Sequence, residues 1–224
     1  AANIVKRENT RVSKLIGINK AARTTCVKPA GTTSLVLGTS SGIHAWHNDY
    51  YIRRLRVGKN EPIYNYLKLH NPSLVEDEYF RPHDTAVIEI PQSAPKGSIL
   101  RTESAFDLLK RVKRVATEWV KPGHRRGSNT HNVSATVSLK SDEWDKAGKW
   151  MWENRECYNG LSVLPYDGGT YTQAPFEDIT KTEFNKRVKS LNYINLSNIV
   201  ETTDETDLSG ELACAGGSCE ITGL

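Results

Sequence analysis

The sequence has no long apolar run and little cysteine. Nowhere in its 224 residues do about 20 consecutive apolar residues occur, the length that a membrane-spanning helix needs, and no signal-peptide pattern opens the chain. Four cysteines are too few for a disulfide framework. These absences argue against a membrane partner and against a disulfide-rich secreted domain, so we expect a cytoplasmic protein.

Methionine is also scarce, because Met151 is the only one and the first residue is Ala1. We therefore expect either a fragment of a longer polypeptide or a processed product, including one that has lost its initiator methionine.

The charge is only mildly basic. A net charge of +4 and a pI near 8.8 suit a site for an anionic ligand. They fall well short of the charge density of a dedicated nucleic-acid binder, so no nucleic-acid partner is expected. With 38% hydrophobic and 25% charged residues, the composition is that of a globular protein.

One long amphipathic helix is predicted over residues 105–119, where apolar side chains recur at spacings of three and four. Ser104 and Asp107 form a capping-box pattern at its start. Pro122 and Gly123 predict its end.

Two further helices are indicated by their first residues. Ser141 predicts the cap of one helix, and Thr180 with Glu183 predicts the cap of another. A short helical pattern also covers residues 61–69.

Apolar and alternating segments predict strands between these helices. They cover residues 85–90, which Pro91 closes, then 133–139 and 160–165. The segment 51–57 alternates as well, and strand and helix edge both remain open for it. Strands that alternate with helices indicate an α/β fold.

The segment from Cys26 to Ser34, CVKPAGTTS, has the composition of an anion-binding loop. Pro29 and Gly31 shape a tight turn, and the three hydroxyl residues Thr32, Thr33 and Ser34 lead into residues 35–37 as a first helical turn. The N-terminus of a helix presents unpaired N–H groups and partial positive charge, which suit a phosphate. The Walker A spacing is absent. A capped helix after a turn is the alternative interpretation.

Cys214 and Cys219 form a C-x4-C pair near the end of the chain. Five extended steps span roughly 17 Å, whereas a disulfide needs Cα atoms within about 7 Å. The two glycines between them make the necessary turn accessible. An exposed pair suits thiol–disulfide exchange, with inert thiols or a zinc site as alternatives. No second Cys or His pair lies nearby to complete a zinc site.

Other candidate residues have simpler interpretations. Cys26 and Cys157 are interpreted as small buried hydrophobes. His44 and His47 are three residues apart and fit one helix face, but two histidines without a third ligand do not define a metal site. We predict no metal site from the sequence.

Four stretches taken together resemble a known family. They are CVKPAGTTSLVLGTSSGIHAWHNDYYIRR (26–54), GSNTHNVSATVS (127–138), YNGLSVLPYDGGTYTQAPFE (158–177) and ACAGGSCE (213–220). In this order they resemble the adenosylcobalamin-dependent (class II) ribonucleotide reductases, and most closely their ribonucleoside-triphosphate reductase type.

The resemblance implies a fold and a set of site residues. Residues 1–200 would form the C-terminal part of a ten-stranded α/β barrel, and 201–224 would be a flexible tail. The substrate phosphates would be bound by the loop residues Pro29, Ala30, Gly31, Thr32, Thr33 and Ser34. Cys214 and Cys219 would re-reduce the active-site disulfide, and thioredoxin or a similar dithiol would in turn reduce them.

The departures from the family are equally informative. No Asn-Pro-Cys-x-Glu-like loop occurs, so the radical-forming cysteine is expected outside this chain. Most contacts to the adenosylcobalamin cofactor are also missing. The resemblance therefore implies two further partners: an N-terminal part of the reductase and a ribonucleotide substrate. The alternatives are a non-catalytic anion-binding or assembly domain and a small thiol oxidoreductase.

Overall fold

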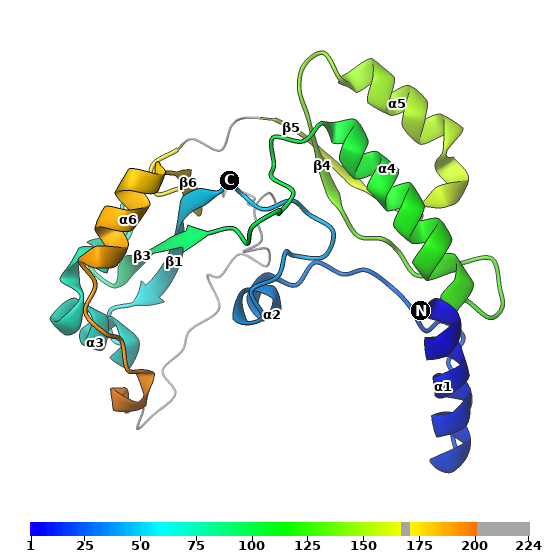
Figure 1. Cartoon of the computed structure of the whole chain (residues 1–224), viewed down its shortest axis with the longest axis horizontal. Helices are drawn as coiled ribbons and strands as arrows, with labels where there is room; N and C mark the ends of the chain where they lie inside the picture. The colour runs from blue at the N-terminus through cyan, green and yellow to red at the C-terminus, as the bar shows by residue number, and fades with distance from the viewer. Residues whose placement is uncertain (167–170, 201–224) are drawn as a thin grey trace. The chain divides into compact units, whose positions relative to one another are not determined.

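The computed structural model describes residues 1–166 and 171–200, and within this part the chain forms two compact units (Figure 1). The first unit comprises Ala1–Ala45 and Arg101–Tyr166, and the second comprises Trp46–Leu100 and 171–200. Both combine helices and strands, which confirms the mixed α/β prediction. The tail predicted at 201–224 lies outside the described residues.

The first unit is built from helices around a pair of parallel strands, β4 and β5. Its elements are α1 (Ala2–Leu15), α2 (Gly31–Val36), α4 (Ala105–Val115), the π-helical turn η2 (Ala116–Val120), the 3-10 turn η3 (Lys121–Gly123), β4 (Thr136–Leu139), α5 (Trp144–Glu153), η4 (Arg155–Cys157) and β5 (Ser162–Pro165).

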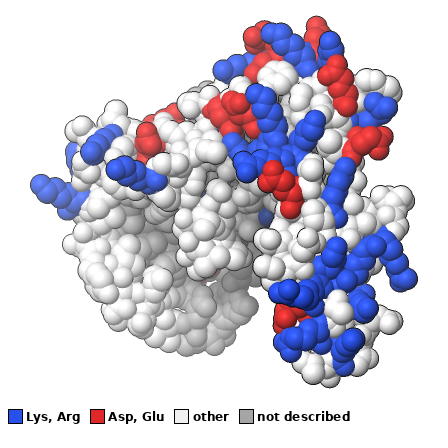
Figure 2. Space-filling view, turned by 45° about the vertical axis from the view of Figure 1, so that its right-hand side comes forward, with Lys and Arg blue, Asp and Glu red and all other residues white. Residues whose placement is uncertain are grey.

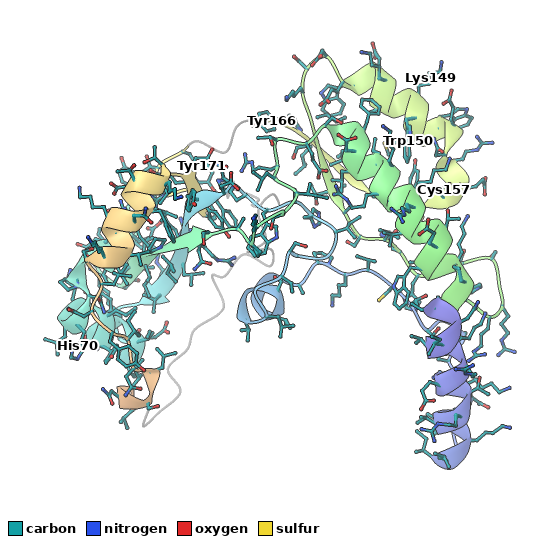
Figure 3. The ribbon with its side chains drawn as sticks, viewed as in Figure 1. His70, Lys149, Trp150, Cys157, Tyr166 and Tyr171 are labelled. Atoms are coloured by element: carbon teal, nitrogen blue, oxygen red, sulfur yellow. The ribbon has the colours of Figure 1, made fainter. Side chains whose placement is uncertain are left out.

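The apolar stripe of α4 packs on the two strands. Leu109 and Val112 are fully buried, and Val137 of β4 meets the same core. Trp150, labelled in Figure 3, packs from α5 against this core. The predicted helix 105–119 is confirmed, although its last turn is π-helical.

The helix caps were predicted with mixed success. The Ser104 hydroxyl accepts the N–H of Asp107 at 3.2 Å, and the Asp107 carboxylate accepts the Ser104 N–H, so the capping box is confirmed. Ser141 was the wrong cap for α5. That helix starts after Glu143, whose carboxylate accepts the Lys140 N–H at 2.9 Å and closes the preceding turn.

The second unit contains an antiparallel sheet in the order β2-β3-β1-β6 within the described residues. Its elements are β1 (Tyr50–Gly58), α3 (Pro62–His70), η1 (Pro72–Leu74), β2 (Val75–Asp77), β3 (Thr85–Ser93), β6 (Phe176–Asp178), α6 (Lys181–Lys189) and η5 (Leu196–Asn198). The open question over 51–57 is settled as strand. The predicted cap of α6 is confirmed, since Thr180 accepts the Glu183 N–H at 3.1 Å.

Strand β3 continues through Pro91, where the sequence predicted an end. Arg54 donates its N–H to Pro175, away from β3, so by alternation the backbone groups of Arg53 and Tyr51 face β3 and those of Ile52 do not. Pro91 faces Ile52 in a non-hydrogen-bonded pair, so its nitrogen points away from β1. Strand β2 pairs only with residues 86–88, so no described strand pairs with β3 on that side at Pro91, although the residue is buried. The missing N–H therefore breaks no ladder bond.

The ten-stranded barrel is not present within the described residues. Each of β2, β6, β4 and β5 has a single strand neighbour in this part of the chain, whereas a closed barrel pairs every strand on both edges. Helices long and apolar enough to cross a membrane are absent from the described residues.

A buried carboxylate ties the second unit together. Glu89 of β3, only 4% exposed, accepts from Arg54 of β1 at 2.7 Å and from Arg187 of α6 at 3.0 Å. Burial opposes the charge on Arg54, but hydrogen bonds to Glu177 and Glu89 raise its guanidinium pKa above its ordinary value. The same two effects act on Arg187, whose pKa is raised by Glu183 and Glu89. Glu89 thus joins α6 to the sheet.

Replacing Glu89 with Gln is expected to destabilise the chain by about 3–5 kcal/mol, because two arginines would lose their buried counter-charge. The matched control is Glu177→Gln, since Glu177 also bonds Arg54 but is 52% exposed. That change is expected to cost less than about 1 kcal/mol. Urea unfolding of both variants checks this, and equal losses would contradict it.

Candidate functional site

The predicted phosphate-loop residues lie at the start of α2. The helix begins at Gly31, so Gly31, Thr32 and Thr33 form its first turn. Among the described residues, the backbone N–H groups of these three residues have no acceptor. Pro29 and Thr33 are exposed. Three unengaged donors at an accessible helix start can receive an anion.

Ala30 and Ser34 have a different role, because their polar groups are used inside the loop. The Ala30 N–H donates to the Ser41 hydroxyl at 3.1 Å. The Ser34 N–H donates to the Ala30 carbonyl at 3.3 Å, and the buried Ser34 hydroxyl bonds the same carbonyl. These bonds shape the loop and leave the first-turn N–H groups as its outward donors.

The chain returns over the base of the loop at Gly42. Its φ of 61° lies in the left-handed region, and a Cβ there would lie 3.3 Å from the Lys28 carbonyl oxygen. Glycine is therefore favoured at position 42 for two reasons: the left-handed backbone conformation and the small space for a Cβ. This close approach holds residues 28–29 in place.

His44 ties the returning segment to the strands. Its Nδ1 donates to the Ser41 carbonyl at 2.8 Å, and its Nε2 accepts the Thr136 N–H at 3.0 Å. Because a carbonyl only accepts and an N–H only donates, the ring is neutral with the proton on Nδ1. Arg111 of α4 adds a bond to the Ile43 carbonyl at 3.0 Å.

The incoming segment is fixed by the end of α4. The Thr25 hydroxyl donates to the Trp119 carbonyl at 2.8 Å, and Trp119 donates its indole N–H to the Cys26 carbonyl at 3.0 Å. A Cβ on Gly123 would meet the Thr25 side chain at 1.9 Å, so only glycine fits there. Val27 then pairs with Val133 in a parallel bridge.

Comparison with known proteins places the chain beside one enzyme family. No protein-family model matches it. Adenosylcobalamin-dependent ribonucleoside-triphosphate reductases from Lactobacillus delbrueckii subsp. bulgaricus and Lactobacillus leichmannii are 28% identical to it over 223 residues, covering 93% of this chain. The Euglena gracilis reductase is 28% identical over 209 residues, covering 91%. The chain is homologous to these reductases.

The homology covers only a part of each reductase. The chain spans about 28% of the length of the Lactobacillus relatives and 27% of the Euglena one. A crystal structure of a B-12 dependent (class II) ribonucleotide reductase matches 88% of this chain and 28% of its own, with a TM-score of 0.71 and 24% identity. That likeness shows that the chain shares the fold of this part of the reductase.

Cys214 and Cys219, which were predicted to act as a redox relay, lie outside the described residues, and both their pairing and that role stay predictions. The prediction that Cys26 is buried is wrong. In the extended segment 25–27 side chains alternate, so Thr25 is buried, Cys26 is exposed and Val27 turns back toward the core. Cys157, labelled in Figure 3, is half-buried.

The two histidines do not share a helix face. His44 bonds within the first unit, whereas His47 lies in the second, 2.9 Å from Asp178 and stacked on Phe176. In the described part of the chain no group of three His, Cys, Asp or Glu side chains is placed to hold a metal ion.

A pocket of about 220 Å³ lies in the second unit and contains none of the predicted site residues; it is lined by Ser73, Leu74, Glu183, Arg187, Ser190 and Leu191.

The residues that anchor the loop 28–34 could hardly be recognised from the sequence. Ser41, Thr25 and Trp119 act through side-chain hydrogen bonds to distant backbone groups. The run TSSGIH at 39–44 carried the one available signal, a glycine and a histidine close behind a helix start. A left-handed glycine against another backbone cannot be recognised from spacing alone.

Gly42→Ala is expected to destabilise the chain more than Gly38→Ala. Both glycines have φ near 60°, but only Gly42 has a close backbone neighbour. Alanine in the left-handed region costs about 1–2 kcal/mol at either position, and the contact with Lys28 adds to the loss at Gly42. Urea unfolding and amide exchange at Ala30 measure the difference. Identical values would show that the close approach is unimportant.

Proposed function

We propose that the chain is the part of an adenosylcobalamin-dependent ribonucleotide reductase that holds the substrate phosphates and relays electrons to the active site. The observation that carries this proposal is the anchored loop with three unengaged N–H groups at Gly31–Thr33, in a chain homologous to such reductases over 93% of its length. The reaction would convert ribonucleoside triphosphates to 2′-deoxyribonucleotides.

Phosphate binding would use backbone donors more than side-chain charge. The N–H groups of Gly31, Thr32 and Thr33 would bond phosphate oxygens at the start of α2, with the exposed Thr33 hydroxyl as a further donor. Lys28 is exposed next to the loop and would add a positive charge. Loop anchoring by Gly42 and His44 would keep these donors in place before the substrate arrives.

The relay would be carried by the tail. The Cys214 and Cys219 thiols would reduce a disulfide in the active site by thiol–disulfide exchange and become a disulfide themselves. A thioredoxin-like dithiol would then reduce that disulfide, and its own two thiols would be oxidised. Two electrons thus move from the external dithiol to the active site in each turnover.

Adenosylcobalamin is expected to bind mainly to the rest of the reductase, where it would supply the homolytic radical chemistry. We assign no cofactor-binding residue within this chain. The ten-stranded barrel would likewise be completed only with that remaining polypeptide.

Reconstitution tests the proposal. The chain is combined with the polypeptide from the same organism that is homologous to the rest of the reductase, and deoxyribonucleotide formation is measured with adenosylcobalamin and dithiothreitol. The chain alone is expected to be inactive and the mixture active. An inactive mixture in which both polypeptides are folded and bound would overturn the proposed activity.

In the reconstituted enzyme, Cys214→Ser and Cys219→Ser are each expected to abolish turnover driven by thioredoxin. Turnover with dithiothreitol should persist, because a small dithiol reaches the active-site disulfide without the tail. Cys26→Ser is the matched control, since Cys26 is also an exposed thiol, and it should leave both rates unchanged. Loss of both rates in the tail variants would refute the relay.

Thr33→Val is expected to raise the KM for the ribonucleotide by a factor of about 10 to 150, because a hydroxyl that bonds a charged phosphate contributes about 1.5–3 kcal/mol. Thr39→Val serves as the control, because Thr39 is an exposed hydroxyl residue three positions beyond α2. Steady-state kinetics on both variants provide the test. An unchanged KM for Thr33→Val would remove this hydroxyl from the phosphate site.

A non-catalytic anion-binding domain is the second candidate, and one observation favours it. All the hydrogen bonds described for the loop come from the first unit itself. Tight binding of tripolyphosphate to the isolated chain, together with failure of every reconstitution, would support this alternative.

A further inference from the structure

Helix α1 presents its apolar side to solvent and its polar side to the protein. At 100° per residue, Ile4, Val5, Val12 and Leu15 lie on one side of the helix, and all four are exposed, with Leu15 at 71% and Ile4 at 60%. Ala2 and Ser13 on the opposite side are buried. This orientation is the reverse of that expected for a surface helix.

The inward side of α1 is held by polar contacts. Lys6 donates to the Pro122 carbonyl at 2.8 Å, and Arg125 donates to the hydroxyl of Thr10 at 2.9 Å. The Asn9 side chain accepts the Ala21 N–H at 3.0 Å. These bonds fix the rotation of the helix, so the apolar side cannot turn inward without breaking them.

The apolar surface continues beyond the helix. Ile16 and Ile18 are each 62% exposed and extend the row that ends at Leu15. Glu8 lies on the same side of the helix, paired with Arg11, so the apolar residues lie on either side of this ion pair. Exposed apolar residues gathered on one side of a helix indicate an interaction site. We call the surface formed by Ile4, Val5, Val12, Leu15, Ile16 and Ile18 the α1 face.

The α1 face is bordered by positive charge. Figure 2 shows Lys and Arg side chains gathered over α1. Around this face the helix carries Arg7, Arg11 and Lys14, and its single acid, Glu8, is already paired with Arg11 at 2.6 Å. A second copy of the chain would bring the same positive border against itself. An apolar partner surface with an acidic border fits better.

We infer that the α1 face is the docking surface for the reductase polypeptide that accounts for the rest of the relatives' length. This rests on the proposed function. The chain spans about 28% of the relatives, and in the matched class II structure the corresponding part is one segment of a single longer chain. In such a longer chain, the surface where this part meets the remainder is buried. We therefore expect that surface to be apolar.

The test measures binding of the whole chain to that complementary polypeptide by isothermal titration calorimetry. Leu15→Glu is expected to weaken binding at least tenfold, because a charge replaces a side chain buried on docking. Ile4→Ser, which adds no charge, should weaken it by a smaller factor. Leu69→Glu is the matched control, since Leu69 is equally exposed on α3 in the second unit, and it should bind like the wild type.

Other outcomes overturn the inference. They are wild-type affinity in Leu15→Glu, or no binding by the wild-type chain. A dimer of the wild-type chain seen by sedimentation velocity and lost in Leu15→Glu would assign the face to a second copy. Co-sedimentation with phosphatidylglycerol vesicles that Leu15→Glu abolishes would assign it to a membrane surface.

Activity separates this inference from the proposed function. Complex formation that depends on Leu15 but yields no deoxyribonucleotide would sustain the docking surface and reject the activity. Full turnover together with wild-type affinity in Leu15→Glu would sustain the activity and reject the docking surface.

Discussion

The first unit depends on how the end of α4 receives the segment that leads into the loop. Where the helix widens into the π-helical turn η2, the carbonyl of Trp119 is free to accept the Thr25 hydroxyl, and the indole of Trp119 bonds back to Cys26. Gly123 leaves the space that Thr25 fills. Residues 25–28 are therefore held between a helix end and residues 132–134, which precede strand β4, and the position of α2 follows from these contacts.

The two units are stabilised by different kinds of polar interaction. In the first, neutral hydrogen bonds from Thr25, Ser41 and His44 fix backbone groups around the loop. In the second, buried carboxylates bring strands and turns together. Glu89 links α6 to the sheet, and Glu78, also buried, accepts two backbone N–H groups of the following turn at 2.7 Å.

The sequence predicted those features that depend on local chemistry. The Ser104–Asp107 box and the Thr180 cap involve residues three apart, so their spacing alone identifies them. The apolar stripe of α4 was recognised because it faces the core. Helix α1 was not predicted, because its apolar side faces outward and residues of the inward side bond to distant groups such as Pro122. Pro91 led to a wrong strand end for a similar reason, since its effect depends on whether a strand pairs with β3 on the side that its nitrogen faces.

In the candidate site, too, the sequence predicted what local residue types decide and missed what distant residues decide. The residue types of 29–34 indicated an anion-binding turn, and the structure places Gly31–Thr33 at a helix start. Residue types could not show that the polar groups of Ala30 and Ser34 are consumed inside the loop, because this depends on Ser41 and on the path of the returning chain. The exposure of Cys26 likewise follows from alternation set by its neighbours, not from the preference of cysteine for the interior.

Pro91 has a consequence for how the sheet of the second unit ends. Beyond residues 86–88 no described strand pairs with β3 on the side that the Pro91 nitrogen faces, and Pro91 is nevertheless buried. Any other residue at this position would bury a backbone N–H beside no partner strand, which costs free energy. Proline carries no such donor, so the pairing of β3 can stop here without an unsatisfied polar group.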